Sequence, residues 1–187
     1  MNYDIRNYVK VFNDVLDQKT CASIIDELQY HVLEKHSWSD NGKNQYVYDG
    51  DIDVSFTSTS FDPLICERIQ NITDYYCSNV VNSDNWFNRC DFFTAIRYNI
   101  YKERTKMANH CDHIHSIFDG EVKGVPILSM VGLLNDKFKG GNLVMWGDYK
   151  VPLVPGSIVV FPSNFMFPHQ VTEITNGVRY SFVSWGW

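Results

Sequence analysis

The amino-acid sequence predicts a mainly β domain with helices packed on one outer face. The chain has 187 residues, which suits one domain, and 15% of them are aromatic, a class enriched in strands. After residue 90, short apolar stretches alternate with turn signals at 119–120, 140–141, 155–156 and 176–177, and no helical pattern separates them. Such a series is typical of an antiparallel sandwich, a jelly roll or a barrel.

Two helical patterns precede the strands. Over residues 17–33 the apolar side chains recur at helical spacing, and Thr20 is a candidate cap for this helix. A second pattern covers residues 61–81. It starts with Asp62, a capping residue type, followed by Pro63, which favours the first helical turn. We expect both helices to cover one face of the β structure.

A polar stretch, rich in Asn, Asp and Gly, lies between the two helices at residues 38–53. It shows little periodicity apart from a candidate short strand at 45–48. Long loops in compact domains often act as lids or binding elements. Residues 38–60 therefore have two interpretations: a mobile lid, with Trp38 as a substrate-contacting residue, or a plain surface loop.

The second half of the chain carries seven candidate strands. We expect a single domain over 1–187, in which 1–90 supply the helical support and the loop, and 91–187 form the β core. The predicted strands are residues 92–101, 126–135, 142–146, 150–154, 157–162, 169–174 and 178–187.

Charge and cysteine usage narrow the class of protein. The formal net charge of −6 argues against a broad nucleic-acid-binding surface. Residues 1–6 lack the apolar run of a secretory signal, and no apolar segment approaches the roughly 18 residues that span a bilayer. The five cysteines show no C-x-x-C spacing. We expect a cytoplasmic protein that binds neither nucleic acid nor membrane.

Metal-binding side chains crowd into residues 109–116, which read N-H-C-D-H-I-H-S. His110 and Asp112 are two positions apart, so on extended backbone they point to the same face. One imidazole and one carboxylate form two-thirds of a 2-His-1-carboxylate triad, which suits Fe(II) and leaves coordination positions open. The third ligand should be a histidine on another strand, and His169, which opens a later strand, is the natural candidate.

The remaining histidines are weaker candidates. His31 and His36 lie in or just after the first helix, and His113 and His115 are local to the first two ligands. His115 shares the parity of the ligand pair and lies beyond it, so it is a candidate substrate contact. The roles of His113 and His115 stay open.

Arg179, ten residues after His169, could reach the same interior if the intervening hairpin has the right loop. A three-residue loop at 175–177, with its glycine left-handed, pairs Arg179 with Glu173. His169, Arg179 and Ser181 then share one face, whereas a two-residue loop turns Arg179 to the opposite side. The first register predicts that iron holds one end of a five-carbon dicarboxylate and that Arg179 pairs with its far carboxylate.

These motifs together, His110-Cys-Asp112, His169 and Arg179-Tyr-Ser181, resemble the Fe(II)/2-oxoglutarate-dependent dioxygenases. Within that superfamily the chain is most similar to the prolyl 4-hydroxylase-like group, including its small bacterial and phage-encoded members. The resemblance covers most of the chain, because residues 11–25 look like the opening strand and helix of the group, and residues 133–143 like its strand and Gly-Gly turn.

The resemblance implies a double-stranded β-helix, a distorted jelly roll, with the N-terminal helices on one face. It assigns 2-oxoglutarate contacts to Arg179, Tyr101, Ser181 and Ser129, the last at a position where threonine is common. Trp185 falls where the group often carries a tryptophan, which makes it a candidate substrate contact. The chain departs from the pattern at three positions near the co-substrate pocket, Arg104, Met107 and Leu133.

The implied reaction uses Fe(II), 2-oxoglutarate and O₂, with ascorbate as a candidate reductant. It hydroxylates an unactivated C–H bond, in this group that of a peptidyl proline, and releases succinate and CO₂. Halogenation is disfavoured, because related halogenases replace the carboxylate ligand by a small residue and Asp112 is present here. A peptide or protein substrate is therefore expected.

Three alternatives remain. A free amino acid or another protein side chain could replace the peptidyl proline as substrate. A cupin-like module could bind metal without turnover, although it would have no need of Arg179 and Ser181. A nucleic-acid demethylase of the same superfamily usually carries a second arginine six residues after the first, where this chain has Trp185.

Overall fold

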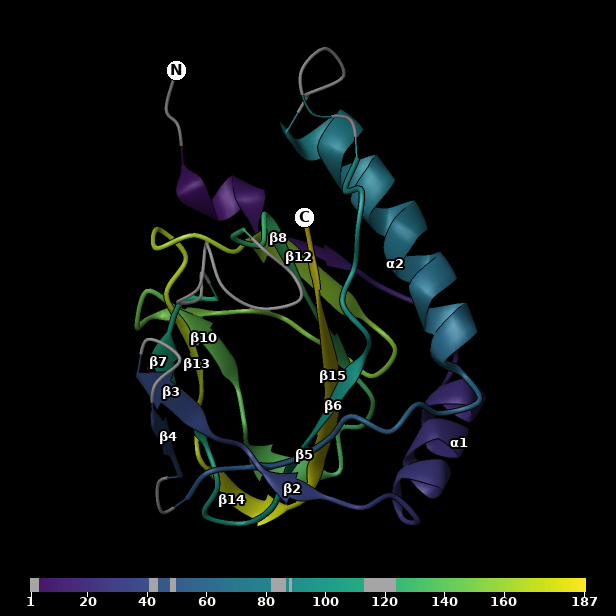
Figure 1. Cartoon of the computed structure of the whole chain (residues 1–187), viewed down its shortest axis with the longest axis vertical. Helices are drawn as coiled ribbons and strands as arrows, with labels where there is room; N and C mark the ends of the chain where they lie inside the picture. Colours follow the sequence, from purple (N-terminus) through teal and green to yellow (C-terminus); the bar gives the residue numbers. More distant parts are fainter. Residues whose placement is uncertain (1–3, 41–43, 48–49, 82–86, 88, 113–123) are drawn as a thin grey trace.

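The computed structural model describes residues 4–40, 44–47, 50–81, 87, 89–112 and 124–187. In this part of the chain, helices cover one side of a large antiparallel sheet, and a smaller sheet faces its other side (Figure 1). The predicted mainly β fold with helices on one face is confirmed. The helical elements are η1 (Ile5–Tyr8, 3-10), α1 (Gln18–Leu28), α2 (Asp62–Tyr76) and its π-helical continuation η2 (Cys77–Val81).

The large sheet holds seven strands, and every neighbouring pair is antiparallel. Strands from the N- and C-terminal parts of the chain therefore lie side by side. In spatial order they are β1 (Lys10–Phe12), β12 (Ile158–Pro162), β8 (Leu128–Leu133), β15 (Arg179–Gly186), β6 (Arg97–Tyr101), β5 (Asp53–Ser55) and β2 (Glu34–Lys35).

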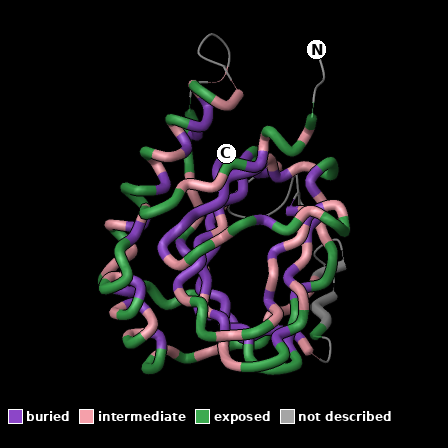
Figure 2. Tube along the Cα trace, turned by 180° about the vertical axis from the view of Figure 1, so that it is seen from behind, coloured by how far each residue is buried: buried purple, intermediate pink, exposed green. Residues whose placement is uncertain are grey.

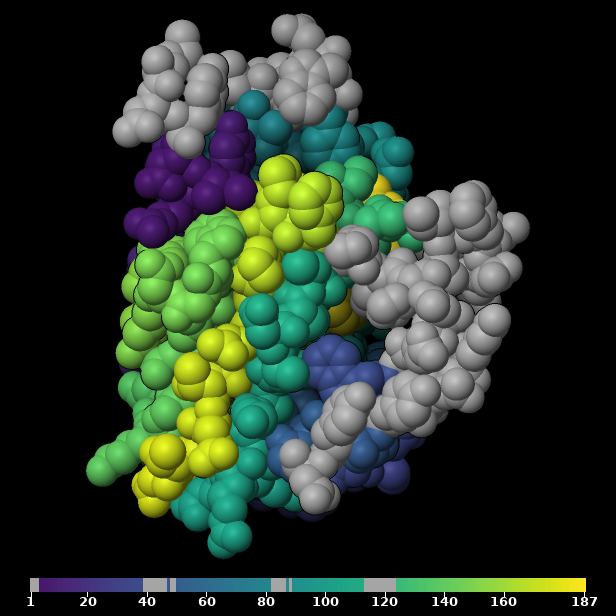
Figure 3. All heavy atoms as spheres, turned by 90° about the vertical axis from the view of Figure 1, so that its left-hand side faces the viewer, coloured from purple at the N-terminus to yellow at the C-terminus, as the bar shows by residue number. Residues whose placement is uncertain are grey.

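The smaller sheet has four strands, and two further strand pairs extend the structure. Figure 3 shows the outer face of this sheet, where the yellow β13 lies between the green β10 and the teal β7. The strands of the smaller sheet are, in spatial order, β11 (Tyr149–Lys150), β10 (Leu143–Met145), β13 (His169–Val171) and β7 (Met107–His110). The two further pairs are β14 (Ile174–Gly177) with β9 (Phe138–Gly140), and β3 (Trp38–Asp40) with β4 (Asn44–Tyr46).

The two faces of the large sheet line two separate cores. On β6, Tyr98 and Ile100 belong to the helix-side core, which packs against α1 and α2, whereas Tyr101 belongs to the inter-sheet core. On β12, Val160 and Val159 divide in the same way. Alternate side chains of a strand point to opposite faces, so this parity decides which residues reach the space between the sheets.

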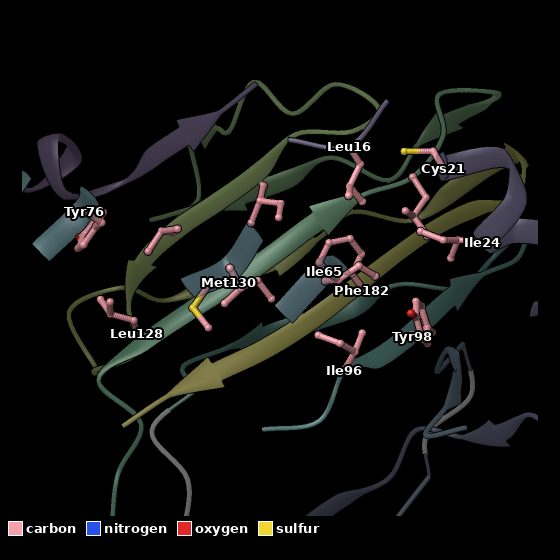
Figure 4. Packing of buried hydrophobic residues seen from close by; sticks show 14 of the residues in the cluster. Leu16, Cys21, Ile24, Ile65, Tyr76, Ile96, Tyr98, Leu128, Met130 and Phe182 are labelled. Carbon is pink, nitrogen blue, oxygen red and sulfur yellow. The ribbon is translucent and has the colours of Figure 1, made fainter. Parts of the chain in front are cut away.

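The helix-side core is built from both helices and the large sheet. Figure 4 shows Ile24 of α1 and Ile65 of α2 in one cluster with Tyr98, Met130 and Phe182. All five side chains are fully buried, and Figure 2 shows buried positions following the strands while the helices expose their outer faces. Burial of apolar surface against the sheet is therefore what fixes the helices in place.

The first helix starts at a different cap from the predicted one. The carboxylate of Asp17 accepts a hydrogen bond from the backbone N–H of Thr20 at 2.6 Å, so Asp17 is the cap and the prediction of Thr20 was wrong. The helix also ends at Leu28, five residues short of the predicted end. Tyr30 and Val32 beyond it are exposed, which removes the packing that would extend the helix.

The second helix begins at Asp62, but this residue does not cap it. The N-cap position is Phe61, without a side-chain hydrogen bond, and Pro63 occupies the first turn as predicted. The Asp62 carboxylate instead accepts hydrogen bonds from the hydroxyls of Thr59 and Tyr98. The predicted capping role was therefore wrong, and Asp62 ties the helix to β6.

The predicted hairpin between His169 and Arg179 was wrong, although its glycine behaves as expected. Gly177 has φ of +81°, but β14 pairs with β9 and not with β15. Arg179 pairs with Tyr101 and not with Glu173. The chain leaves the smaller sheet after β13 and enters the large sheet at Arg179, so the two strands belong to different layers.

The predicted strands lie at the right positions in the sequence, but they are longer than the observed ones. β8, β10, β12 and β15 all lie inside their predicted ranges. The predicted strand 169–174 is two strands with a break after Val171, the predicted strand 92–101 is regular only from Arg97, and the predicted strand 150–154 is limited to β11, which ends at Lys150. The strand expected at 45–48 is β4, whose pairing with β3 was not predicted.

The turn at Gly140 gives a test of this topology by a matched pair of substitutions. Gly140 and Gly147 both have positive φ, of 78° and 84°. A Cβ at Gly140 would overlap the carbonyl oxygen of Glu173, whereas a Cβ at Gly147 would meet nothing within 4 Å among the described residues.

We expect Gly147→Ala to lower the free energy of unfolding by about 1 kcal/mol, through backbone strain alone. Gly140→Ala should cost at least about 2 kcal/mol more, because backbone must move. Urea unfolding measures both losses, and equal losses would contradict the β9–β14 approach.

Candidate metal and co-substrate site

Backbone pairing brings the three predicted metal ligands together. His110 ends β7, Asp112 follows two residues later, and His169 opens β13 directly opposite His110 in the β7–β13 pair. One ligand atom from each residue lies within 4.8 Å of the other two. Asp112 and His169 are buried, and His110 is partly buried. The predicted grouping is thus present in the structure, on the smaller sheet.

Both imidazoles are oriented in the same way, with Nδ1 against a backbone carbonyl oxygen. Nδ1 of His110 lies 2.8 Å from the carbonyl oxygen of Ala108, and Nδ1 of His169 lies 3.1 Å from that of Phe167. A carbonyl oxygen can only accept, so each Nδ1 donates its proton there, and each Nε2 faces the carboxylate of Asp112. Such a backbone contact orients a ligating histidine before the metal arrives.

The carboxylate of Asp112 lies between the two Nε2 atoms. Its Oδ1 is 3.4 Å from Nε2 of His110, and its Oδ2 is 3.7 Å from Nε2 of His169. Burial opposes ionisation of Asp112, but His169, His110 and the hydroxyl of Ser129 together hold the pKa of this carboxyl below its usual value. Burial also lowers the pKa of His169. The cluster thus brings together one carboxylate and two imidazoles, the donor groups that bind a divalent cation.

Ser129 supports the metal cluster rather than standing apart from it. Its hydroxyl donates to Oδ2 of Asp112 at 2.6 Å and lies 2.8 Å from the hydroxyl of Ser163. This contact on the carboxylate was not foreseen, since the sequence resemblance placed Ser129 against the co-substrate. It makes Ser129 a positioning residue for Asp112.

Replacement of Ser129 by alanine should weaken metal binding without unfolding the protein. Loss of the hydroxyl frees the carboxylate of Asp112 to rotate, and outer partners of this kind are worth about 10–100-fold in metal affinity. Calorimetric titration of the metal-free protein with Mn²⁺ measures the change. Ser184→Ala is the matched control, because Ser184 is equally buried and bonds Thr94 instead of the cluster. Equal affinities for the two variants would rule out the positioning role.

Arg179 lies buried in the large sheet, with 1% of its surface exposed. Its Nη1 donates to the hydroxyl of Ser181 at 2.7 Å, and its guanidinium lies over the ring of Tyr101 at 4.8 Å. Its Nε is buried and has no hydrogen-bond partner among the described residues. Burial lowers the pKa of this guanidinium, yet arginine stays charged in proteins. A buried cation with an unused donor and only neutral partners is suited to an anionic ligand.

The structure also places the candidate substrate residues. The Trp38 ring meets the ring of His110 edge-on at 5.4 Å, so this loop residue lies beside the metal cluster. Trp185 lies on β15 and supports the guanidinium of Arg97, 4.9 Å from its ring. His115 and His113 lie outside the described residues, as do parts of the loop 38–60 that was considered a lid.

Two residues near the site were missed in the sequence. Arg97 shares the parity of Tyr101 on β6, and that parity could have revealed it as an inward side chain. His36 packs edge-on against Trp38, and burial lowers its pKa to about 4, with Arg97 adding to the shift. No sequence pattern distinguishes His36, because it lies outside regular secondary structure.

A β-helix that holds two imidazoles and one carboxylate between its sheets defines a class of protein, the 2-His-1-carboxylate metalloproteins, whose characteristic metal is Fe(II). The residues fit an Fe(II) ion, because the two Nε2 atoms and the carboxylate converge on one point. They also fit a dicarboxylate, since Arg179 offers a buried cation in the same interior.

The comparisons with known proteins agree with this class. Residues 96–187, about half of the chain, match the model of the 2OG-Fe(II) oxygenase superfamily. The resemblance to Fe(II)/2-oxoglutarate-dependent oxygenases is confirmed for this part of the chain.

A PKHD-type hydroxylase of Shewanella oneidensis is 34% identical over 94 residues, which are 47% of this chain and 40% of that protein. One of Crocosphaera subtropica is 29% identical over 98 residues, 49% of this chain and 41% of that protein. The matched region thus spans about two-fifths of these relatives.

Solved structures confirm the fold over nearly the whole chain. The viral collagen prolyl hydroxylase of Paramecium Bursaria Chlorella virus-1, in a complex with 2OG, has a TM-score of 0.65 at 13% identity, covering 95% of this chain and 94% of that one. A Pseudomonas putida prolyl-4-hydroxylase has a TM-score of 0.64 at 17% identity, covering 96% and 91%. The double-stranded β-helix prediction is therefore confirmed. No helix among the described residues has the length and apolar character to cross a membrane.

Proposed function

We propose that this protein is an Fe(II)- and 2-oxoglutarate-dependent dioxygenase that hydroxylates a peptidyl proline. One observation carries the proposal: the cluster of His110, Asp112 and His169 shares its interior with the buried, carboxylate-free Arg179. A module that only binds metal has no use for that buried cation, whose placement costs free energy. The superfamily match over residues 96–187 supports the same chemistry.

The residues have distinct roles in this proposal. His110, Asp112 and His169 would hold the metal on one side, which leaves the opposite positions for co-substrate and oxygen. Arg179, with Ser181 beside it, would bind the far carboxylate of 2-oxoglutarate. When bound, Fe(II), 2-oxoglutarate and O₂ supply the oxidative chemistry that yields succinate, CO₂ and a hydroxylated C–H bond. We retain ascorbate as a candidate reductant.

Tyr101 would shape the pocket between the metal and Arg179. Its ring packs against the guanidinium, and both side chains project from paired positions of β6 and β15. Burial raises the pKa of Tyr101, with Arg179 opposing the shift, so the phenol keeps its proton at neutral pH. A neutral phenol can donate a hydrogen bond to an anionic co-substrate without adding charge.

A peptide substrate is supported by the relatives. One structural neighbour is a prolyl hydroxylase of Trichoplax adhaerens in complex with a peptide fragment of hypoxia inducible factor, with a TM-score of 0.63 at 17% identity. Trp38 beside His110 and Trp185 on β15 supply aromatic surface near the metal, which suits a proline ring.

We also propose that residues 1–187 act as one domain, because helices of the N-terminal half close the core of the sheet built by the C-terminal half. None of the five cysteines, all of which lie in the described part of the chain, forms a disulfide, which fits a reducing cytoplasm.

The decisive experiment is succinate formation and mass change in a panel of proline-containing peptides and free amino acids. Peptide-dependent turnover above the uncoupled background, with a mass gain of one oxygen on the peptide, is the expected result. His169→Ala serves as the inactive control. Turnover with a free amino acid and none with any peptide would reject the peptidyl proline and keep the dioxygenase.

A further inference from the structure

Arg97 is a second cation in the interior, and the chemistry described so far does not use it. It lies on β6 with the inward parity of Asn99 and Tyr101, and it pairs with Val183 of β15. Its guanidinium lies over the ring of Trp185, whose strand partner Ser129 bonds the ligand Asp112, so Arg97 is on the side of the metal cluster. Val183, its partner on β15, is two residues from Trp185 and four residues from Arg179. Arg97 therefore occupies a different part of the interior from the proposed co-substrate arginine.

The surroundings of Arg97 orient the side chain without neutralising it. Its Nε donates to Oδ1 of Asn99 at 3.2 Å, and the ring of Trp185 supports its guanidinium at 4.9 Å. Among the described residues no carboxylate lies within ion-pair distance of it. Its two Nη atoms make no hydrogen bond in this part of the chain, and neither is enclosed by protein. The free edge of the guanidinium is thus available to a ligand.

Burial makes this arrangement costly unless an anion completes it. Desolvation lowers the pKa of Arg97, although part of the residue remains exposed. The carboxylate of Asp51 accepts a hydrogen bond from Trp38 and forms no ion pair with Arg97.

The charges of the loaded site leave Arg97 unbalanced. The double charge of the metal and the charge of Arg179 balance Asp112 and the two carboxylates of 2-oxoglutarate. Arg97 is not matched by any of these charges, and its partly exposed guanidinium can meet an anion that enters from outside. An anionic group on the substrate would complete the balance, and a carboxylate matches the fork of an arginine held flat on an aromatic ring.

We propose that Arg97, oriented by Asn99 and Trp185, binds a carboxylate of the substrate and so selects acidic substrates. The inference rests on the proposed function and specifies its substrate class. The carboxylate has two sources: the α-carboxylate of a free amino acid or a chain end, and an acidic side chain next to the target residue in a peptide. Arg97 acts as a specificity-determining residue, whereas Arg179 serves the co-substrate.

Binding to the loaded but non-reacting protein tests this inference. The protein, loaded with Mn²⁺ and 2-oxoglutarate, is titrated by calorimetry with L-proline and L-prolinamide, and with the peptide acetyl-Pro-Glu-amide and its Gln counterpart. In the wild type, at least one acid form should bind about 10–100-fold more tightly than its amide. Arg97→Met should remove that difference, and Arg97→Lys should keep part of it. The pair that shows the difference identifies the source of the carboxylate.

Two controls separate the roles of the arginines. Arg89→Met removes an exposed arginine and should leave every affinity unchanged. The affinity for 2-oxoglutarate, followed by the visible charge-transfer band of its Fe(II) chelate under anaerobic conditions, should stay within about twofold in Arg97→Met.

Each other outcome overturns the inference. If no acid form binds the wild type better than its amide, Arg97 does not recognise a substrate carboxylate. If Arg97→Met weakens 2-oxoglutarate binding as strongly as the substrate acids, Arg97 is a co-substrate residue. Absence of the chelate band in the wild type would instead reject the proposed function, so the two failures are distinguishable.

Discussion

Replacement of Arg179 by methionine is expected to abolish 2-oxoglutarate binding and, at the same time, to stabilise the protein without ligands. The first effect follows from losing the buried cation that pairs with the far carboxylate of the co-substrate. Removing one partner of a buried charge pair costs about 3–5 kcal/mol, which is at least a ~100-fold loss of affinity. Anaerobic titration of the charge-transfer band measures it.

The second effect has the opposite sign because the guanidinium lacks a carboxylate partner in the free protein. Its contacts are the hydroxyl of Ser181 and the ring of Tyr101, and its Nε has no partner. Methionine has a similar length and no charge to desolvate, so unfolding of the metal-free, ligand-free variant should cost about 1–3 kcal/mol more than in the wild type. Urea unfolding of both proteins gives this difference.

Arg89→Met is the matched control, since Arg89 is exposed and should affect neither measurement. Added 2-oxoglutarate with metal should raise the stability of the wild type but not that of Arg179→Met, because only a bound ligand shifts the folding equilibrium. Normal binding of 2-oxoglutarate by Arg179→Met would refute the assignment of this residue.

Replacement of His169 by alanine should remove metal binding and all dependent turnover. The substitution removes one of the three metal ligands. Loss of a residue that only hydrogen-bonds to a ligand already lowers metal affinity about 10–100-fold, so we expect the Mn²⁺ affinity to fall at least ~100-fold. Calorimetric titration of the metal-free protein measures it, and the chelate band should disappear in parallel.

His36→Gln is the control that makes this test specific. His36 lies close enough to influence the surroundings of His110 and Arg97, yet it is not part of the three-residue ligand group. Its replacement should change metal affinity by no more than a few-fold. A greater loss in His36→Gln than in His169→Ala would mean that the metal is held by a different set of histidines.

Local pattern was enough to predict two of the three residues of the metal cluster. Their spacing of two predicted that His110 and Asp112 point to one side, and in the structure Asp112 meets His110 from the bend just after β7. His169 was the natural third member because it stands at the start of a later strand. The β7–β13 pair then places it opposite His110, a contact between residues 59 positions apart in the sequence.

Features that depend on competition between neighbours were predicted less well. Asp17 and Thr20 are both good caps, and the choice depends on which backbone N–H groups the helix leaves free. Asp62 looked like a cap but bonds Tyr98, a strand residue that comes 36 positions later. A local hydrogen bond thus decided the cap of the first helix, and a tertiary contact decided the role of Asp62 in the second.

The sequence by itself determined the fold class and picked out the three side chains that the structure groups together, because these depend on short-range periodicity and residue chemistry. Only the tertiary structure decided that β13 and β15 lie in different sheets, and so that Arg179 faces Tyr101 rather than Glu173. It alone brought Arg97 onto Trp185. The reason is physical: strand partners are chosen by burial across the whole chain, and no local pattern contains that choice.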